Sequence, residues 1–430
     1  MLFGTMTTQD NQLTIGGRTA RDLIADHGSP LYVYDLALIK HNLRAFKTHF
    51  SSKLFDTRIA YASKAFLTKA MVRLLQAEGT SLDLVSAGEL HTAIAGGFDL
   101  SQALFHGNNK SPEELELCLS HGVGLIMVDN IDELDQLIER AAASGQVVHT
   151  LLRVNPGVEA HTHEYVITAK HSSKFGESIY DNERIAAIMN RYRDQSHVVL
   201  DGFHCHIGSQ IFDITSYLKT IEVMSTFINK ITAQFELSIS TLNLGGGFGV
   251  FYTDGDTPMD IETTGRTLIR ALEEKQITNE LSIKTLIIEP GRSIVANAGT
   301  TLYTVGHTKR TYGGKHYLFV DGGMTDNIRP ALYQAEYSAD LANRMTDQKD
   351  THYTVAGKLC ESGDVLIRDI QLPAANPGDI LAIYSTGAYT YSMASNYNRL
   401  LRPAVVFVED GKSSVVVRRE TYDDLLRNDV

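Results

Sequence analysis

Side chains that can do nucleophilic, acid–base and anion-binding chemistry recur in this sequence at the ends of short apolar runs. Lys64 ends one run, glycines 245–247 end another and Glu289 ends a third. A lysine in a partly desolvated position can attack a carbonyl carbon, and a glycine triplet lets backbone N–H groups approach a phosphate closely. Lys64 alone could be a surface lysine, and the glycine triplet alone could be a tight turn. The occurrence of both features at the ends of apolar runs is what indicates a site.

Two further side chains extend this set. Glu289 is costly to bury unless a cation pairs with it, and a protonated pyridine nitrogen would be such a partner. Arg292 could add a bidentate contact to a phosphate, and the flat ring of His206 could stack on a heteroaromatic cofactor. A surface ion pair and a satisfied core histidine are the ordinary alternatives for these two residues. Taken together, the residues predict a pyridoxal-phosphate site with the cofactor held as a Schiff base on Lys64.

The apolar runs predict the elements that position these side chains. Eight runs, each followed by a helical pattern, lie at residues 59–63, 82–86, 103–107, 125–129, 151–155, 202–208, 242–247 and 286–290. Continuous apolar runs are typical of strands buried on both faces of a parallel sheet. Eight strand–helix units over about 250 residues predict a (β/α)8 barrel, in which functional groups lie at the carboxyl ends of the strands. An open doubly wound sheet shares the alternation and is the less favoured alternative.

Several of the other run ends are polar as well, and the helices between runs carry start and stop signals. The polar residues are Asp83, Ser86, Arg153, Asn155, His204, Ser209 and Gln210. Ser111-Pro112-Glu113-Glu114 combines an N-cap serine, a proline at the first helical position and a glutamate three residues after the cap. In the next unit Ile131, Leu134 and Ile138 share one helical face, and Gly145 fits the end of that helix.

The pattern changes after residue 299, where strand-like runs alternate with turn signals. The runs lie at 301–308, 316–320, 352–356, 380–385 and 414–418. They predict a mostly antiparallel β domain, which the strand-like segment at 31–34 could join. The expected division is therefore a TIM-like barrel at 36–298 and a β domain made of 1–35 and 299–430.

Composition narrows the classes of partner. The chain has 430 residues, 43% hydrophobic and 21% charged, which is typical of a soluble globular protein. A net charge of −12 disfavours nucleic acid or an anionic membrane as a partner. Three cysteines, no signal-like segment and no long apolar stretch predict no disulfides, no membrane span and a cytoplasmic location. No metal site is expected, because His161, His163 and Glu164 lack the spacing of helical ligands.

Motifs along nearly the whole chain resemble, in order, those of the fold-type III pyridoxal-phosphate decarboxylases. They are Tyr61-Ala62-Ser63-Lys64-Ala65, His204-Cys205-His206-Ile207-Gly208-Ser209-Gln210, Gly245-Gly246-Gly247, Glu289-Pro290-Gly291-Arg292, Asp321-Gly322-Gly323-Met324, Arg329-Pro330-Ala331-Leu332-Tyr333, Cys360-Glu361-Ser362-Gly363-Asp364 and Gly387-Ala388-Tyr389. The resemblance implies a barrel with a β domain, a small-molecule amino-acid substrate, and a homodimer whose active sites form between two subunits. One departure is Phe66, where many relatives have a polar residue.

The resemblance implies a role for each matching position. Lys64 would carry the cofactor, His206 would stack on its ring and Glu289 would keep the pyridine nitrogen protonated. The implied cofactor-binding residues are Lys64, Asp83, Arg153, His206, Ser209, Gly245, Gly246, Gly247, Glu289, Gly291, Arg292 and Tyr389. Cys360 of the partner subunit would protonate the carbanionic centre, since a thiol with a reference pKa of about 8.5 is mostly protonated at neutral pH. The catalytic residues would thus be Lys64, Cys360 and His206.

Within this family the chain is most similar to members that convert meso-2,6-diaminopimelate to L-lysine and CO2, the last step of lysine biosynthesis. That substrate has a complete amino-acid head at its far end. Arg292, Arg329 and Tyr333 would hold its distal carboxylate, with Tyr389 nearby, and Glu361 of the partner subunit would hold its ammonium group. The choice of the D-configured centre for loss of CO2 is implied by the resemblance alone.

Three alternatives remain open from the sequence. A decarboxylase of ornithine, arginine or carboxynorspermidine is disfavoured by Arg329 and Tyr333, which suit a distal carboxylate. A racemase on the same barrel would not be expected to carry the motif at Cys360, and a non-catalytic cofactor-binding relative should lack Lys64 or Cys360. The polar, irregular segment 161–174 is expected to form a mobile loop over the active site.

Overall fold

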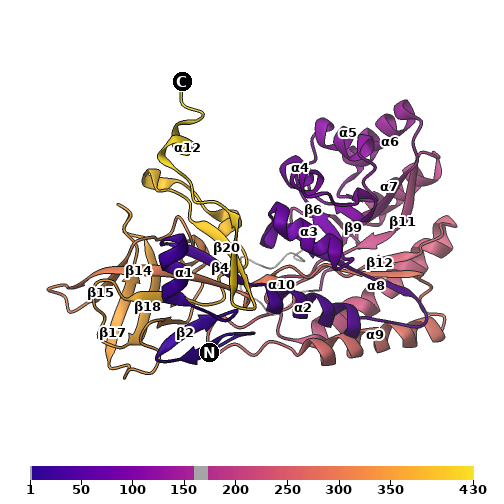
Figure 1. Cartoon of the computed structure of the whole chain (residues 1–430). Helices are drawn as coiled ribbons and strands as arrows, with labels where there is room; N and C mark the ends of the chain where they lie inside the picture. Colours follow the sequence, from indigo (N-terminus) through magenta and orange to yellow (C-terminus); the bar gives the residue numbers. More distant parts are fainter. Residues whose placement is uncertain (1, 159–172) are drawn as a thin grey trace. The chain divides into compact units, whose positions relative to one another are not determined.

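The structure is a computed structural model that describes residues 2–158 and 173–430. The expected loop at 161–174 lies, apart from its last two residues, outside the described residues, as do the three residues weighed as metal ligands. The chain divides into two compact units (Figure 1). The barrel unit contains 43–249 and 258–291, and the β unit contains 1–42, 250–257 and 292–430. The expected domain boundary at 36–298 stays a prediction.

The barrel unit contains eight parallel strands that close on themselves. They are β5 Asp56–Ala62, β6 Ser81–Leu84, β7 Ala103–Phe105, β8 Leu125–Val128, β9 Val148–Asn155, β11 Val198–His204, β12 Thr241–Asn243 and β13 Thr285–Ile288. The pairing order is β9, β11, β12, β13, β5, β6, β7, β8, and a β8–β9 pairing completes the circle, while the short β10 Glu177–Ser178 adds to β9. The eight predicted runs are these strands, so the barrel prediction is confirmed and the open-sheet alternative is wrong.

Helices lie around the strands of the barrel unit (Figure 1). They are α3 Lys69–Ala77, α4 Ala87–Gly96, α5 Pro112–Ser120, α6 Ile131–Ser144, α7 Asn182–Arg193, α8 Ile214–Phe235 and α9 Ile261–Ile277, with the 3-10 helices η1 Ser63–Ala65 and η2 Leu100–Gln102; α2 Leu36–His49 begins in the β unit. The predicted start of α5 is confirmed, because Ser111 and Glu114 form a reciprocal capping box. The predicted end of α6 is confirmed by Gly145, which adopts a φ of 66°.

Apolar side chains from five of the barrel strands pack together in the barrel unit. One buried cluster consists of Ala60, Leu104, Leu125, Met127, Leu151 and Ile287. Such a packed interior leaves only the strand ends for polar chemistry. Among the described residues, no helix is both long and apolar enough to cross a bilayer.

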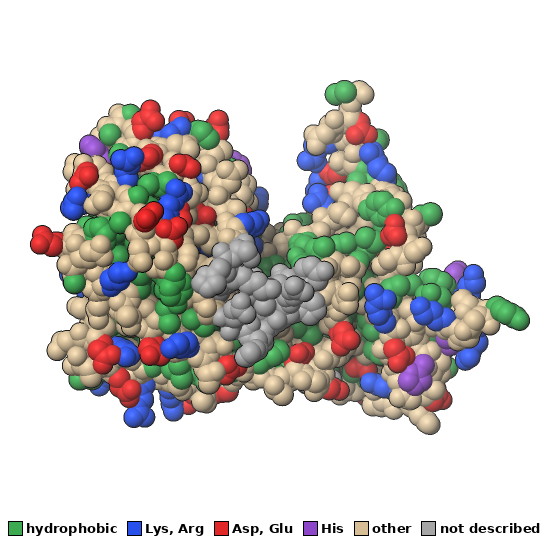
Figure 2. All heavy atoms as spheres, turned by 180° about the vertical axis from the view of Figure 1, so that it is seen from behind, with side chains coloured by type: hydrophobic (Ala, Val, Ile, Leu, Met, Phe, Trp, Pro, Cys, Tyr) green, Lys and Arg blue, Asp and Glu red, His purple; other side chains and the backbone are tan. Residues whose placement is uncertain are grey.

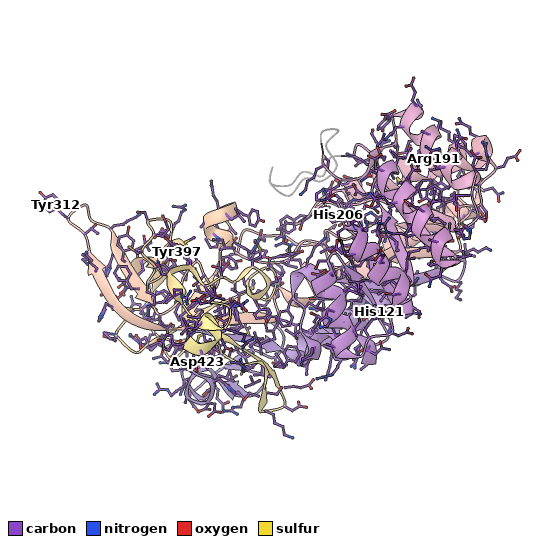
Figure 3. The ribbon with its side chains drawn as sticks, turned by 90° about the horizontal axis from the view of Figure 1, so that it is seen from above. His121, Arg191, His206, Tyr312, Tyr397 and Asp423 are labelled. Atoms are coloured by element: carbon purple, nitrogen blue, oxygen red, sulfur yellow. The ribbon has the colours of Figure 1, made fainter. Side chains whose placement is uncertain are left out.

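The β unit is built on strands that are mostly antiparallel. They are β4 Leu31–Asp35, β14 Gly299–Arg310, β15 His316–Val320, β16 Ala339–Leu341, β17 Thr351–Ala356, β18 Val365–Leu372, β19 Ile380–Ile383, β20 Ala404–Glu409 and β21 Lys412–Val417, and β1 Thr7–Gln9, β2 Gln12–Ile15 and β3 Arg18–Thr19 form a separate small sheet. The long strand β14 pairs with β15, β19 and β4, so the expected N-terminal strand does join this sheet. Tyr312 projects from the tip of the hairpin between β14 and β15 (Figure 3).

The sequence patterns missed some elements of this unit. They are β16, β18, β20 and the short helices α1 Ala20–His27, α10 Arg292–Val295, α11 Arg329–Tyr333 and α12 Tyr422–Leu426. Strand β18 lies at the end of the sheet order and exposes Arg368 and Asp369 near its middle, which interrupts its apolar pattern. On the face of each unit seen in Figure 2, acidic and basic side chains are interspersed, so the negative net charge is not gathered there in one block.

Gly202→Ala should destabilise the barrel unit. A Cβ built at Gly202 in β11 would lie 1.7 Å from the carbonyl oxygen of Thr241 in β12, so the two strands would have to separate. Overpacking of this kind costs about 1–3 kcal/mol, and we expect the apparent Tm to fall by about 2–12 °C. In the control Gly88→Ala, on α4, the nearest heavy atom would be 3.8 Å away. An unchanged Tm in Gly202→Ala would contradict the packing of these strands.

Candidate active site

Lys64 lies in η1, directly after β5. It is exposed, while the residues on either side of it are buried. The Tyr61 hydroxyl donates a 2.8 Å hydrogen bond to the carbonyl oxygen of Phe66, which ties the strand end to the segment after the lysine. Phe66, the departure from the family pattern, is fully buried. Lys64 interacts electrostatically with Asp83 and His206, so it belongs to the polar cluster at this end of the barrel.

The buried carboxylate of Glu289, directly after β13, is the centre of that cluster. Asn243 Nδ2 donates to Oε1 over 2.6 Å, and His106 Nε2 lies 2.8 Å from the same oxygen. His204 Nε2 lies 3.2 Å from Oε2, and His106 Nε2 is also 3.6 Å from Asp83 Oδ1. The ends of β7, β11 and β12 thus converge on one carboxylate.

These neighbours give the two carboxyl groups opposite tendencies. Burial alone would raise the pKa of Glu289, but the imidazoles of His106 and His204 beside it hold that pKa well below its usual range. Burial raises the pKa of Asp83, and although His106 opposes this, the neighbouring Glu289 carboxylate adds to it. Burial lowers the pKa of His204 to about 4. At neutral pH Glu289 is therefore ionised and His204 is neutral.

His206 and the glycine segment are packed against one another (Figure 3 labels His206). Gly246 N–H donates to His206 Nδ1 over 3.2 Å, and burial lowers the pKa of His206 well below its usual range, so the ring is neutral and Nδ1 accepts. Gly245 N–H donates to Asn243 Oδ1 over 2.9 Å. A Cβ on Gly246 would lie 2.1 Å from the carbonyl oxygen of Glu289, so this close approach requires glycine.

The remaining predicted residues of the barrel unit also lie at strand ends. Arg153, in β9, is buried enough for its pKa to be lowered, and its guanidinium lies 4.4 Å from the centre of the Phe175 ring. Ser209 follows β11 in the segment that carries His206. Gly291 packs so closely on the end of β5 that a Cβ would lie 2.9 Å from the Cβ of Ala62.

The β unit contains a second buried polar cluster, made of two arginines and three tyrosines. Arg292 Nη1 donates to the Tyr252 hydroxyl over 2.6 Å, and Arg329 Nη1 donates to the Tyr337 hydroxyl over 2.5 Å. The Arg292 guanidinium lies 4.8 Å from the ring centre of Tyr389, and that of Arg329 lies 4.8 Å from the ring centre of Tyr252. Both arginines are therefore held in place by aromatic faces and hydroxyl groups.

Tyrosine hydroxyl groups and rings, which carry no formal charge, contact both guanidinium groups of this cluster. Burial would lower the pKa of Arg329, but Tyr252 and Tyr337 outweigh it and hold that pKa above its usual range. Burial would raise the pKa of Tyr252, but Arg292 and Arg329 beside it lower it. In the part of the chain that the structure describes, no carboxylate forms an ion pair with Arg329. A bound carboxylate would supply this missing partner.

Three predicted residues of the β unit are not part of the arginine–tyrosine cluster. Tyr333 closes α11, four residues after Arg329, and is half-buried. Cys360 and Glu361 are exposed after β17, where the Cys360 N–H donates to the side-chain oxygen of Asn398 over 2.8 Å. Neither Cys360 nor Glu361 has a hydrogen bond or ion pair with Arg329 among the described residues.

Sequence reasoning did not find four residues of these clusters. His106 and Asn243 lie at strand ends, in two of the predicted runs, so the signal that found Glu289 could have found them. Tyr252 and Tyr337 lie in irregular segments without a motif, and only the structure brings them to the arginines.

One group of the barrel cluster has the donor types of a metal site. Potential ligand atoms of His106, His204 and Glu289 all lie within 4.8 Å of one another. Both imidazoles are, however, already within hydrogen-bond distance of the carboxylate. The geometry is therefore that of an imidazole–carboxylate network.

The burial of His204 should make stability depend on pH. The folded chain keeps His204 neutral down to a pKa of about 4, whereas an unfolded histidine titrates at about 6.5. The unfolded chain thus binds the extra proton between these values, and stability falls by about 3 kcal/mol as the pH is lowered through this window. We expect the Tm of His204→Gln to fall less steeply from pH about 6.5 to about 4. Parallel curves for this variant, the exposed control His149→Gln and the wild type would contradict this.

Comparisons with known proteins extend over the whole chain. A family model described as "Pyridoxal-dependent decarboxylase, pyridoxal binding domain" matches residues 36–296. The diaminopimelate decarboxylase of Bacillus subtilis is 48% identical over 427 residues, which cover 99% of this chain and 97% of the relative. That of Staphylococcus aureus is 42% identical and covers 98% of each chain.

Solved structures give the same result. The crystal structure of diaminopimelate decarboxylase from M. jannaschii in complex with L-lysine superposes with a TM-score of 0.93 at 32% identity, covering 100% of this chain and 99% of that one. A full-length match of this kind includes the β unit as well as the barrel unit. The chain therefore belongs to the diaminopimelate decarboxylase family of pyridoxal-dependent decarboxylases.

Proposed function

We propose that this protein is a pyridoxal-phosphate-dependent carboxy-lyase that converts meso-2,6-diaminopimelate to L-lysine and CO2. Relatives that match over their full length carry this activity in their names, and the M. jannaschii structure is described with L-lysine. The observation within this chain that carries the substrate choice is Arg329, buried among tyrosines without a carboxylate partner among the described residues. Ornithine and arginine have no distal carboxylate to offer it.

The residues of the barrel unit fit pyridoxal phosphate. Asp83 Oδ1 is a buried acceptor without a hydrogen bond among the described residues, and Glu289 is an ionised carboxylate that suits a protonated ring nitrogen. The glycine segment at 245–247 presents backbone where a side chain would clash, as a phosphate site requires. When bound, the cofactor supplies an electron sink for the pair released as CO2 leaves.

Four residues of this chain would prepare that chemistry. Lys64, which is exposed directly after a strand end, would bind the cofactor aldehyde through Nζ. The neutral ring of His206 could stack on the cofactor without adding a positive charge. Glu289 remains ionised and would hold a proton on the ring nitrogen, which would sustain the electron demand of the ring. Arg153 would add a positive charge beside the cofactor, and the remaining residues predicted to bind it would line its site.

The arginines of the β unit would recognise the substrate. Arg329 and Arg292 bind carboxylate oxygens through their planar guanidinium groups, and Tyr333 and Tyr389 add hydroxyl contacts. Tyr252 and Tyr337 fix the two arginines, so binding needs little reordering of long side chains.

We also propose a cytoplasmic homodimer with shared sites. Cys360 and Glu361 are exposed in the chain, so they are available to a substrate bound by another subunit. Cys360 of the partner subunit would return the proton to the carbon that loses CO2, and Glu361 of the partner subunit would bind the distal ammonium.

A CO2-release assay with separate stereoisomers of diaminopimelate, ornithine and arginine tests this function. We expect release from meso-diaminopimelate with L-lysine as product, and a visible absorption band of the bound cofactor that borohydride abolishes. Lys64→Ala should lack both the band and the activity, because no other residue is assigned to bind the aldehyde. Equal or faster turnover of ornithine or arginine would overturn the substrate choice, and a normal band in Lys64→Ala would overturn the lysine assignment.

Replacement of Arg329 by lysine should weaken substrate binding selectively. Lysine keeps the charge but not the two-pronged donor geometry, so we expect KM for diaminopimelate to rise by about ten-fold or more with a smaller change in kcat. Arg344→Lys is the matched control, because Arg344 pairs with Asp347 and Asp379 away from the tyrosines. A KM within about two-fold of the wild-type value would reject the carboxylate-binding role.

A further inference from the structure

The hydrogen bonds around Glu289 have a defined direction. Asn243 Oδ1 accepts from Gly245 N–H over 2.9 Å, so the amide must turn its Nδ2 toward Glu289, 2.6 Å away. Oε1 is therefore an acceptor, as a carboxylate oxygen is. The orientation of Asn243 is set by the backbone of the glycine segment.

The tautomer of His204 follows from its burial. Its Nδ1 is buried without a hydrogen bond among the described residues. A buried N–H without an acceptor is rarer and costlier than a bare acceptor nitrogen. The proton therefore lies on Nε2, which donates to Glu289 Oε2 over 3.2 Å. His106 Nε2, 2.8 Å from Oε1, donates as well, because an ionised carboxylate only accepts.

These donors occupy the carboxylate unevenly. A carboxylate offers about four lone-pair positions, two on each oxygen. Among the described residues, Oε1 accepts from Asn243 and His106, whereas Oε2 accepts from His204 alone. We propose that His106, His204 and Asn243 are positioning residues that orient Glu289 so that one acceptor position, on Oε2, is kept for the ring N–H of the cofactor. This inference rests on the proposed function and assigns residues that no motif of the sequence singled out for this role.

Removal and replacement of the donors tests the inference in the holoenzyme. His106→Leu and His204→Leu each remove one donor, whereas His106→Gln and His204→Gln can place an amide N–H near the former Nε2. We expect the leucine variants to raise the cofactor dissociation constant and to lower kcat by about ten-fold or more, with KM for diaminopimelate within about two-fold. The glutamine variants should recover most of both losses. The dissociation constant is measured by titrating apoenzyme with pyridoxal phosphate and following the visible band.

Two controls separate positioning from general packing. Met127→Leu changes the barrel interior without removing a donor and should leave the dissociation constant unchanged. The asparagine side chain in His106→Asn is polar but too short to reach Glu289, so this variant should behave like His106→Leu. It replaces His106→Leu in the test if the leucine variant does not fold. If the wild type releases CO2 but its folded leucine or asparagine variants bind the cofactor with normal affinity, the inference is overturned while the proposed function stands. Glutamine variants as impaired as the leucine variants, or a stoichiometric metal ion that His106→Leu removes, would also overturn the inference.

Discussion

An ionised carboxylate buried inside a protein must be surrounded by donors, and the end of this barrel is arranged around that requirement. Glu289 lies after β13, and its donors come from the ends of β7, β11 and β12. Parallel strands in a closed barrel bring their carboxyl ends to one rim. Without closure, residues 106, 204 and 289 would not meet, so the charge on Glu289 depends on the topology of the whole unit.

The same requirement explains why two buried carboxyl groups of similar chemistry differ. Glu289 receives three side-chain donors, whereas Asp83 has His106 only at 3.6 Å and keeps a buried oxygen without a hydrogen bond among the described residues. Hydrogen bonds therefore favour the ionised form of Glu289, and burial favours the neutral form of Asp83. The site separates a permanent anion from a group that can take up a proton.

Much of this could be predicted from the sequence, because strands and their ends leave a local signal. Apolar runs predicted all eight barrel strands, and the polar residues at their ends included Lys64, His206 and Glu289. His106 carried the same signal, but a histidine after a strand says nothing about its partner until the barrel closes. Tyr252 and Tyr337 had no signal at all, because they lie in irregular segments and their role consists of contacts with arginines 40 and 8 residues away in the sequence. Local periodicity in the sequence predicts helices and strands, whereas side-chain hydrogen bonds between different segments are known only from the structure.

The arginine cluster follows a different physical logic from the glutamate cluster. Glu289 accepts from three side-chain donors, which favour its ionised form and fix its orientation. Arg329 has tyrosine hydroxyls and ring faces, which hold a guanidinium in place without neutralising it. A carboxylate in the place of those tyrosines would form a buried ion pair, and a substrate carboxylate would then have to compete with it. Tyrosines are therefore the side chains that can orient a buried arginine and still leave its charge to an incoming anion.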